Sequence, residues 1–392
     1  MTRMLDPEQD RAPAALRSQA VKTAIMVDRV TIQDIARLAG VSKATVSRVI
    51  NQKPDVDIVT RERILQLMVE HEFVPNVAAS GLAGGRTHLL GVLVPSLTWP
   101  LMPQLMLGIG ELVEHTQYDL VLYTMSQNQD YRILLNRVVS SRMTGGLLAI
   151  FPGSAKGHLI RLHDQGFPVV IIDDQSPSSS LPWVGTDQRE GAKQVVRHLI
   201  DLGHRDIAHI SGPRSYMVSQ DRQAGYVEAL QEAGIAVRDE FIVAGDFKPP
   251  SGVTCGRKLL ESSRRPTAIF AGNDEMAYGV MRAAGDLGLQ IPQDLALAGF
   301  DDISSSAHMQ PSLTTVRQPF YDMGQQALSL LLSRVEASRT LLAPSLHTRR
   351  MTDTDSPSSA SDTIRIQLPS TLIVRASTAA TTLAVPFSTG NP

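Results

Sequence analysis

The chain of 392 residues has a single cysteine and no long apolar run. Cys255 alone cannot form an internal disulfide, and one cysteine with scattered histidines cannot supply the four ligands of a closed zinc site. We expect Cys255 to be a small packed residue. No apolar run approaches the ~18 to 20 residues that a membrane-spanning helix needs. The sequence therefore argues against a disulfide scaffold, a structural zinc site and a membrane-spanning protein.

Motifs of the common enzyme classes are also missing. There is no GxSxG or Walker-type loop, and GIGELV at Gly108 lacks the third glycine of a dinucleotide-binding fingerprint. The pairs Asp173–Asp174 and Asp301–Asp302 each consist of neighbours at a strand end, so their side chains point to opposite faces and form no acid–base dyad. We expect no catalytic residue, no cofactor and no metal, and hence no enzyme.

Residues 1–29 contain scattered arginines and aspartates without an apolar centre, so they do not form a secretory signal. We expect a disordered leader, with translation beginning at Met1 or at Met26. Hydrophobic residues make up 43% and charged residues 19% of the chain, which is typical of a globular protein. The length predicts two or three domains, and we expect them to fold in the cytoplasm.

Residues 31–51 read TIQDIARLAGVSKATVSRVIN and carry the most informative pattern of the chain. They predict two short helices, because apolar residues recur at helical spacing in each. These apolar residues are Ile32, Ile35, Ala36, Ala39, Val46, Val49 and Ile50. Gly40 supplies the turn between the helices, and Ser42 is a good N-cap for the second. The pattern is that of a helix-turn-helix.

The outer face of the second helix is polar and basic. It is formed by Lys43, Ala44, Ser47, Arg48 and Asn51. Arginine can bond guanine bidentately, and small polar groups can bond phosphates. Two packed helices that never touch DNA would show the same spacing. However, residues 29–53 carry a net charge of +4 while the whole chain carries −2, and this concentration favours DNA binding.

A third helix is expected over residues 60–68, capped by Thr60. Its inward side chains would be Ile64, Leu67 and Met68. After it, Asn76 can cap one or two helical turns over residues 77–82. Ala83 to Arg86 form a flexible exit, and a domain boundary is expected there.

From His88 onward, short apolar runs such as LLGVLVP, GLLAIF and PVVIID alternate with amphipathic stretches. This alternation predicts an α/β fold in which parallel sheets are covered by helices on both faces. Polar residues follow several strands, at Asp173–Asp174, Asn273–Asp274 and Asp301–Asp302. Ligands bind outside the carboxyl ends of such strands. About 290 residues favour two lobes with the cleft between them.

Several motifs in order resemble the lactose-repressor (LacI/GalR) family. They are the helix-turn-helix above, VPNVAASGLAGGRTHLLGVLVP, DRQAGYVEAL, PTAIFAGNDEMAYG, ALAGFDDI, PSLTTVRQPFYDMG and LPSTLIVRAST, and they span Val30 to about Thr378. The resemblance implies a homodimeric or tetrameric repressor. It would have a DNA-binding headpiece, a hinge helix and a two-lobed core like the periplasmic sugar-binding proteins.

The expected domains are a leader (1–29), a headpiece (30–75), a hinge helix with linker (76–87), a core (88–378) and a tail (379–392). Within the core, the expected lobes are 88–185 with 319–338, and 186–318 with 364–378. Residues 339–363 are rich in Ser, Thr, Asp and Pro, and we expect a mobile loop there.

Carried over position by position, the resemblance implies base contacts by Lys43, Ala44 and Arg48 and phosphate contacts by Ser47 and Asn51. It also implies that Leu82 wedges into the minor groove and kinks the operator; the alternative is that Leu82 packs against the core. The remaining expected DNA-binding residues are Thr31, Thr45 and Asn76. Gly81 departs from a good hinge helix, since glycine costs roughly 1 kcal/mol there relative to alanine.

In the core, the resemblance implies an effector cleft. Its expected residues are Asp173, Arg222, Asn273 and Asp301, surrounded by Trp99, Phe247, Gln318 and Phe320. Carboxylate, guanidinium and amide groups suit vicinal hydroxyls, and the aromatic rings can stack on sugar C–H groups. As alternatives, Asp301 could cap a helix and Arg222 could pair on its own helix. Family members often carry Asn-Pro-Phe-Phe where this chain has TWPLM at 98–102, so the effector's identity is not inherited. A sugar or sugar acid is favoured over a nucleobase.

We expect a dimer on a pseudo-palindromic operator, with an effector that changes operator affinity by rotating the first lobes. No leucine heptads occur at the C-terminus, which favours a dimer over a tetramer. Control by a co-repressor or by a partner protein is the alternative. A sugar-binding transport protein would share the core, but it would lack the headpiece and carry an export signal. Effector and operator stay unidentified.

Overall fold

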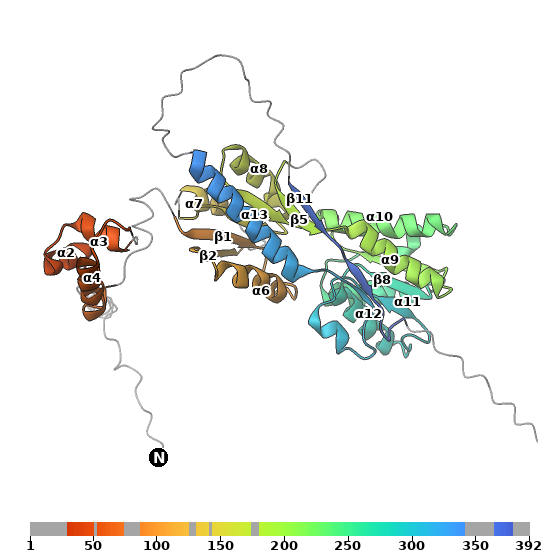
Figure 1. Cartoon of the computed structure of the whole chain (residues 1–392). Helices are drawn as coiled ribbons and strands as arrows, with labels where there is room; N and C mark the ends of the chain where they lie inside the picture. The colour runs from red at the N-terminus through yellow and green to blue at the C-terminus, as the bar shows by residue number, and fades with distance from the viewer. Residues whose placement is uncertain are drawn as a thin grey trace, which may run out of the picture. The chain divides into compact units, whose positions relative to one another are not determined.

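The computed structural model describes residues 30–50, 53–73, 87–124, 131–140, 143–173, 180–341 and 364–378 (Figure 1). The chain divides into two compact units, Met1–Gly85 and Arg86–Pro392. The described part of the first unit is helical, and the second contains parallel sheets, as the α/β prediction requires.

Three helices form the described part of the first unit: α2 (Ile32–Ala39), α3 (Lys43–Ile50) and α4 (Ile58–Glu70). Helix α2 begins with a reciprocal capping box, in which the Asp34 amide donates to the Thr31 hydroxyl and the Thr31 amide donates to the Asp34 carboxylate. It ends at Gly40, whose φ of 65° is a left-handed conformation that glycine adopts at little cost. The turn therefore forms where the sequence predicts it.

The three helices share one small apolar core. Its buried members are Ile35, Ala36, Ala39, Val46, Val49 and Ile64. The expected inward residues Ile32, Ile50, Leu67 and Met68 are partly buried against it. The predicted start of the third helix is wrong by two residues. Asp57, rather than Thr60, is the N-cap of α4, because its carboxylate accepts the Thr60 amide at 2.9 Å.

The first lobe of the second unit is a six-stranded, wholly parallel sheet in the order β11-β5-β4-β3-β1-β2. Its strands are β1 (Leu89–Val94), β2 (Asp119–Thr124), β3 (Leu147–Ile150), β4 (Val169–Ile172), β5 (Trp183–Thr186) and β11 (Arg365–Leu368). The helices beside it are α6 (Met102–Val113), α7 (Tyr131–Ser140), η1 (Gly153–Ala155), α8 (Lys156–Asp164) and α13 (Phe320–Leu341). Alternate strand residues pack against α6 and α13 on one face and against α7 and α8 on the other.

The second lobe is a four-stranded parallel sheet in the order β7-β6-β8-β9. Its strands are β6 (Ile207–Ser211), β7 (Ile242–Ala244), β8 (Ala268–Ala271) and β9 (Ala296–Ala298). Its helices are α9 (Gln188–Asp201), α10 (Met217–Glu232), η2 (Asp239–Phe241), α11 (Pro249–Leu260), α12 (Asp274–Asp286) and η3 (Ser304–Ala307). Helices α9 and α10 cover one face, and α11 and α12 cover the other (Figure 1).

The chain crosses between the lobes near its C-terminal end. Strand β10 (Thr315–Arg317) pairs with β12 (Thr371–Ile373) in an antiparallel ribbon, and β10 leads into α13 of the first lobe. The expectation that 364–378 belongs wholly to the second lobe is wrong. Strand β11 pairs with β5, because the open edge of the first sheet accepts it and Ile366 and Leu368 pack on the first lobe's apolar core.

Helix α13 continues to Leu341, three residues into the segment predicted as a loop. The predictions for the leader (1–29), the hinge helix (76–82), the rest of that loop (342–363) and the tail (379–392) lie outside the described residues. Within the described ranges, no helix is both long and apolar enough to cross a membrane.

Candidate functional site

The outer face of α3 is the candidate DNA-reading surface. Val46 and Val49 are buried beneath it, and this fixes which way the helix turns. Lys43, Ala44 and Arg48 are exposed on the other side. The three expected base-contacting residues thus lie on one exposed face of a helix that follows a tight turn, which is the arrangement that groove-reading helices need.

Some polar side chains of the first unit already form hydrogen bonds or ion pairs within it. The hydroxyl of Thr31 is engaged in the cap of α2, and the hydroxyl of Thr45 lies 2.9 Å from that of Ser42 at the start of α3. The Arg48 Nε lies 3.4 Å from Asp55 Oδ2, and both side chains are more than half exposed. Such surface pairs contribute little, so Arg48 can exchange its partner at small cost.

The expected DNA-binding set also includes Ser47 and three residues outside the described ranges. Ser47 is half-buried on α3. Asn51, Asn76 and Leu82, together with Gly81, lie outside the described residues.

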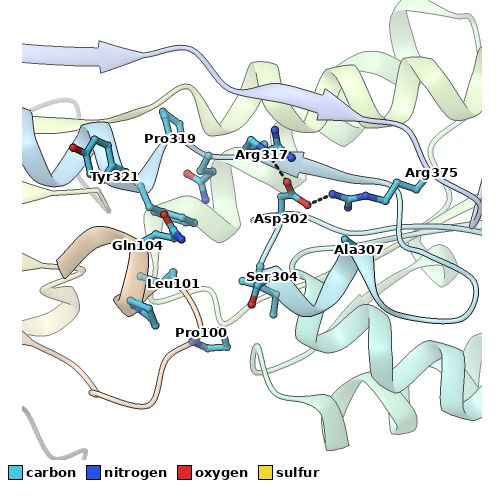
Figure 2. Close-up of a pocket in the computed structure, with 14 residues that line it drawn as sticks. Pro100, Leu101, Gln104, Asp302, Ser304, Ala307, Arg317, Pro319, Tyr321 and Arg375 are labelled. Carbon is cyan, nitrogen blue, oxygen red and sulfur yellow. Dashed lines mark hydrogen bonds and ion pairs between the residues drawn. The ribbon is translucent and has the colours of Figure 1, made fainter. Parts of the chain in front are cut away.

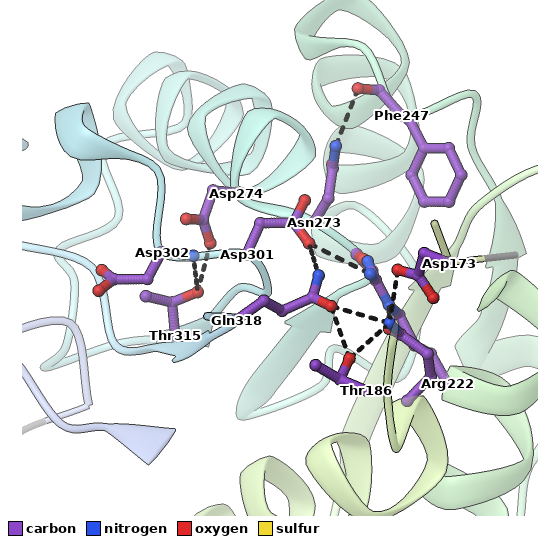
Figure 3. A network of polar contacts seen from close by, with 12 residues as sticks. Asp173, Thr186, Arg222, Phe247, Asn273, Asp274, Asp301, Asp302, Thr315 and Gln318 are labelled. Carbon is purple, nitrogen blue, oxygen red and sulfur yellow. Dashed lines mark hydrogen bonds and ion pairs between the residues drawn. The ribbon is translucent and has the colours of Figure 1, made fainter. Parts of the chain in front are cut away.

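In the second unit, five polar side chains converge from five parts of the chain (Figure 3). Asp173 follows β4 and Thr186 ends β5 in the first lobe, while Arg222 lies on α10 in the second. The Arg222 Nη2 donates to Asp301 Oδ1 at 3.1 Å, and the Gln318 amide donates to the same oxygen at 2.8 Å. Thr186 donates to Gln318 Oε1 at 2.7 Å.

Gln188, which the sequence analysis missed, joins this group. It is the first residue of α9 and is 4% exposed. Its amide nitrogen lies 2.9 Å from Asp173 Oδ2, and its oxygen accepts from Arg222 Nε at 2.9 Å. A signal was available, because Gln188 follows the strand WVGT and so falls at the same carboxyl edge of the sheet as Asp173.

Asn273 and Phe247 hold each other in place. The Asn273 side chain accepts the Met276 amide at 2.9 Å, which caps α12, and donates to the Phe247 carbonyl at 3.1 Å. Phe247 has a φ of 67°. Both the oxygen and the nitrogen of the Asn273 side-chain amide are therefore hydrogen-bonded to the backbone.

Aromatic side chains from both lobes pack in one apolar cluster. Trp99 meets Phe151 edge to face at 5.7 Å, and Tyr216 meets Phe247 at 6.1 Å. All four, with Phe320, belong to a single apolar cluster that includes residues of both lobes. Phe151 and Tyr216 were not predicted; each lies in a loop whose path the sequence does not determine.

Next to this cleft, burial alters the acidity of two carboxyl groups. Burial and the neighbouring Asp301 raise the pKa of Asp274 to about 8, although Ser306, Thr315 and the Ile303 amide all donate to it. Burial also raises the pKa of Asp301, and the Arg222 guanidinium opposes that shift. Asp274 is thus a buried anchor between α12 and η3 that the sequence analysis read only as a strand-end residue.

An open cavity of about 420 Å³ lies beside the crossover segments (Figure 2). Gln318 and Phe320 line it, but Asp173, Arg222 and Asn273 do not. At its wall Asp302 accepts from both Arg317 and Arg375, at 2.6 Å each. The eight predicted cleft residues therefore divide. Four of them meet in the polar network, three belong to the apolar cluster, and Asn273 caps α12. Gln318 of the network and Phe320 of the cluster also line this cavity.

No cluster of three or more His, Cys, Asp or Glu side chains in the described part of the chain could hold a metal ion.

Comparison with known proteins agrees with this architecture. Residues 31–76 match the bacterial regulatory proteins of the lacI family, and residues 196–378 match the periplasmic binding protein-like domain. Catabolite control protein A of Priestia megaterium is 38% identical over 303 residues, which cover 77% of this chain and 91% of that protein. The HTH-type transcriptional repressor PurR of Erwinia tasmaniensis is 34% identical over 311 residues, covering 79% and 91%.

Solved structures of transcriptional regulators have a similar fold. The lac repressor dimer bound to operator and the anti-inducer ONPF matches with a TM-score of 0.76 at 28% identity, covering 90% of this chain and all of that one. A complex of the transcriptional regulator CelR with cellobiose matches with a TM-score of 0.64 at 29% identity, covering 89% and 100%.

The fold and its helix-turn-helix define a DNA-binding regulator of transcription, not an enzyme. The chain belongs to the lacI family of bacterial regulatory proteins.

Proposed function

We propose that the chain is a repressor that binds a pseudo-palindromic operator as a homodimer and responds to a small-molecule effector, a sugar or sugar derivative. Among its structural neighbours, a lac repressor dimer is bound to operator, and CelR is bound to cellobiose. The regulator would act where the DNA is, in the cytoplasm.

For DNA, we propose that Lys43, Ala44 and Arg48 contact base edges. These residues share the exposed face of α3, and two of them are cations, which suits a groove lined by guanine acceptors and flanked by phosphates. Asn51, Asn76 and Leu82 enter this proposal through the family resemblance alone. A dimer would present two such helices to two half-sites.

For the effector, the observation that carries the proposal is the meeting of polar and aromatic groups between the lobes. Arg222 donates to Asp301, and the Gln188 side chain links Arg222 to Asp173, so the acceptors and donors of these side chains lie close together. Trp99 and Phe247 add flat apolar surface. A sugar presents hydroxyls at its edge and C–H groups on its faces, so it matches both kinds of surface.

Control would follow from the two lobes. An effector that binds one arrangement of the lobes more tightly shifts the population toward it, by no more than its difference in affinity. Because the first lobe follows the headpiece and its expected hinge in the chain, a change in lobe arrangement can alter how a dimer presents its two headpieces.

A thermal-shift screen of the purified chain against sugars, sugar acids, polyols and nucleobases tests the effector class, because a ligand of the native state raises the melting temperature. The expected result is a hit among the sugars or sugar acids, which then alters operator binding. A hit confined to nucleobases would reject the sugar while keeping the regulator. The absence of any hit would favour control by a partner protein.

A further inference from the structure

The carboxamide of Gln188 lies where the two lobes meet. Gln188 begins α9 of the second lobe, yet its amide nitrogen lies 2.9 Å from Asp173 and 2.9 Å from Thr186, both of the first lobe. Its oxygen accepts from Arg222 of the second lobe. A single buried side chain thus bonds to both lobes.

The polar groups of this carboxamide are fully used. The nitrogen has two hydrogens and three acceptors in range, the third being Gln318 Oε1 at 2.8 Å. Its one oxygen is engaged by Arg222 Nε. The other two nitrogens of Arg222 donate to the Gly272 carbonyl and to Asp301. With Gln188 in this position, Asp173 Oδ2 and Arg222 Nε are already hydrogen-bonded and are not open to an effector.

We propose that Gln188 is an internal occupant of the effector site, which fastens the lobes together until an effector displaces it. The proposal rests on the function proposed above only in naming this cleft as the effector site. The effector must reproduce what the carboxamide supplies: a donor toward Asp173 beside an acceptor for Arg222 Nε. Two vicinal hydroxyls or a primary amide have that pattern; a carboxylate, which has no donor, does not.

Displacement explains how the cleft selects its ligand. A group that takes the place of Gln188 without a donor removes the hydrogen bond that the buried Asp173 Oδ2 accepts from Gln188, which is costly. An effector also competes with the Gln188 side chain, which is always present. Its apparent affinity is therefore the intrinsic affinity multiplied by the fraction of molecules in which Gln188 is already displaced. Gln188 is therefore a specificity-determining residue.

Tryptophan fluorescence can report whether Gln188 holds the two lobes together, and it needs no known effector. The chain has two tryptophans, and in a Trp183→Phe background Trp99 is the only one. Trp99 belongs to the apolar cluster that includes Tyr216 and Phe247 of the second lobe. Gln188→Ala should loosen the lobes, shift Trp99 emission to longer wavelength and raise its quenching by acrylamide about twofold. The matched control is Gln220→Ala, since exposed Gln220 on α10 bonds only the Arg214 carbonyl among the contacts observed for it.

Acetamide, which is the group removed, then tests occupancy. It should return the emission and the melting temperature of Gln188→Ala toward the parent and leave Gln220→Ala unchanged. Wild-type emission and quenching in Gln188→Ala would refute the fastening role. Altered emission that acetamide does not reverse would refute the occupant role and leave Gln188 as ordinary packing. If circular dichroism shows Gln188→Ala to be unfolded, Gln188→Asn, which keeps the amide one methylene short, replaces it.

Neither sugar nor operator enters these measurements. A chain that binds no sugar can therefore still pass this test, and a sugar-responsive chain can fail it.

Discussion

The guanidinium of Arg222 lies over the ring of Phe300, with 3.9 Å between Cζ and the ring centroid. Both side chains are buried. The ring also faces Gly191 of α9, where any Cβ would come within 3 Å of it. Arg222 is therefore a cation held by an aromatic face beneath it and by hydrogen bonds at its edge. Packing and hydrogen bonds within the protein thus hold the Arg222 guanidinium in one position, without help from a ligand.

Removing this cation should be costly. Arg222→Ala leaves Asp301 buried without its ion pair, and we expect a loss of about 3 to 5 kcal/mol in the free energy of unfolding. Asp301→Ala should cost a similar amount alone, whereas the double variant should cost clearly less than the sum. Urea denaturation of the four proteins gives this cycle. Strictly additive losses would mean that the 3.1 Å contact between the two side chains carries no coupling. Any effector response should be lost in both single variants.

Operator binding should depend on the exposed face of α3. Lys43→Ala and Arg48→Ala should each weaken binding to an operator selected from random DNA by about 1 to 3 kcal/mol, or roughly 5- to 150-fold. Arg37→Ala is the control, since Arg37 is an exposed cation on α2 that pairs with Asp34. Mobility shifts at several salt concentrations measure both affinity and phosphate contacts. If both substitutions leave specific binding intact, α3 does not read the operator.

The sequence predicted what depends on local pattern. The headpiece followed from the spacing of Ile35, Ala39 and Val46, and the capping and turn chemistry is local as well. The expectation that Asp173 and Asp301 lie near one cleft rests on each of them following the carboxyl end of a strand, Asp173 in the first sheet and Asp301 in the second.

What the sequence could not predict depends on the path of loops and on pairing at sheet edges. The place of β11 at the edge of the first sheet follows from an open neighbour, β5, far away in the chain. Glutamine is usually a surface residue, and Gln188 is buried because it lies where the two lobes meet. The two bonds of Asp302 to Arg317 and Arg375 likewise require the crossover segments to be in place.

Two glycines of α12 should respond oppositely to alanine. A Cβ on Gly279 would lie 2.2 Å from the Pro249 carbonyl oxygen of α11, so Gly279→Ala must push two helices apart and should cost about 1 to 3 kcal/mol. Gly285 has open space around it, and Gly285→Ala should stabilise the protein by up to about 1 kcal/mol through helix propensity. Thermal and urea unfolding compare the two. Equal effects would show that α11 can yield at this contact.

His209 should make the second lobe sensitive to acid. Its ring stacks between Tyr226 and Phe270, and its Nδ1 lies 3.0 Å from the Phe270 carbonyl oxygen. Its Nε2 is buried and meets no hydrogen-bonding partner within the described residues. Burial lowers the pKa of His209 to about 4, and the nearby Arg222 acts in the same direction. The folded protein thus keeps this imidazole neutral at pH values where an unfolded chain would protonate it.

The sign of the effect follows from that difference. Between pH ~6.5 and ~4, His209 is protonated in the unfolded state but neutral in the folded state. The contribution of His209 to stability is therefore complete above this pH range and is lost as the pH falls through it. The full loss is about 3 kcal/mol. Asp274 has a raised pKa and acts oppositely, since its penalty grows as the pH rises. The wild type must therefore be compared with His209→Phe, which keeps the stack and removes the titration. Urea unfolding at pH ~7 and pH ~4.5 should show a larger acid loss in the wild type, and equal losses would mean that His209 is protonated within the fold.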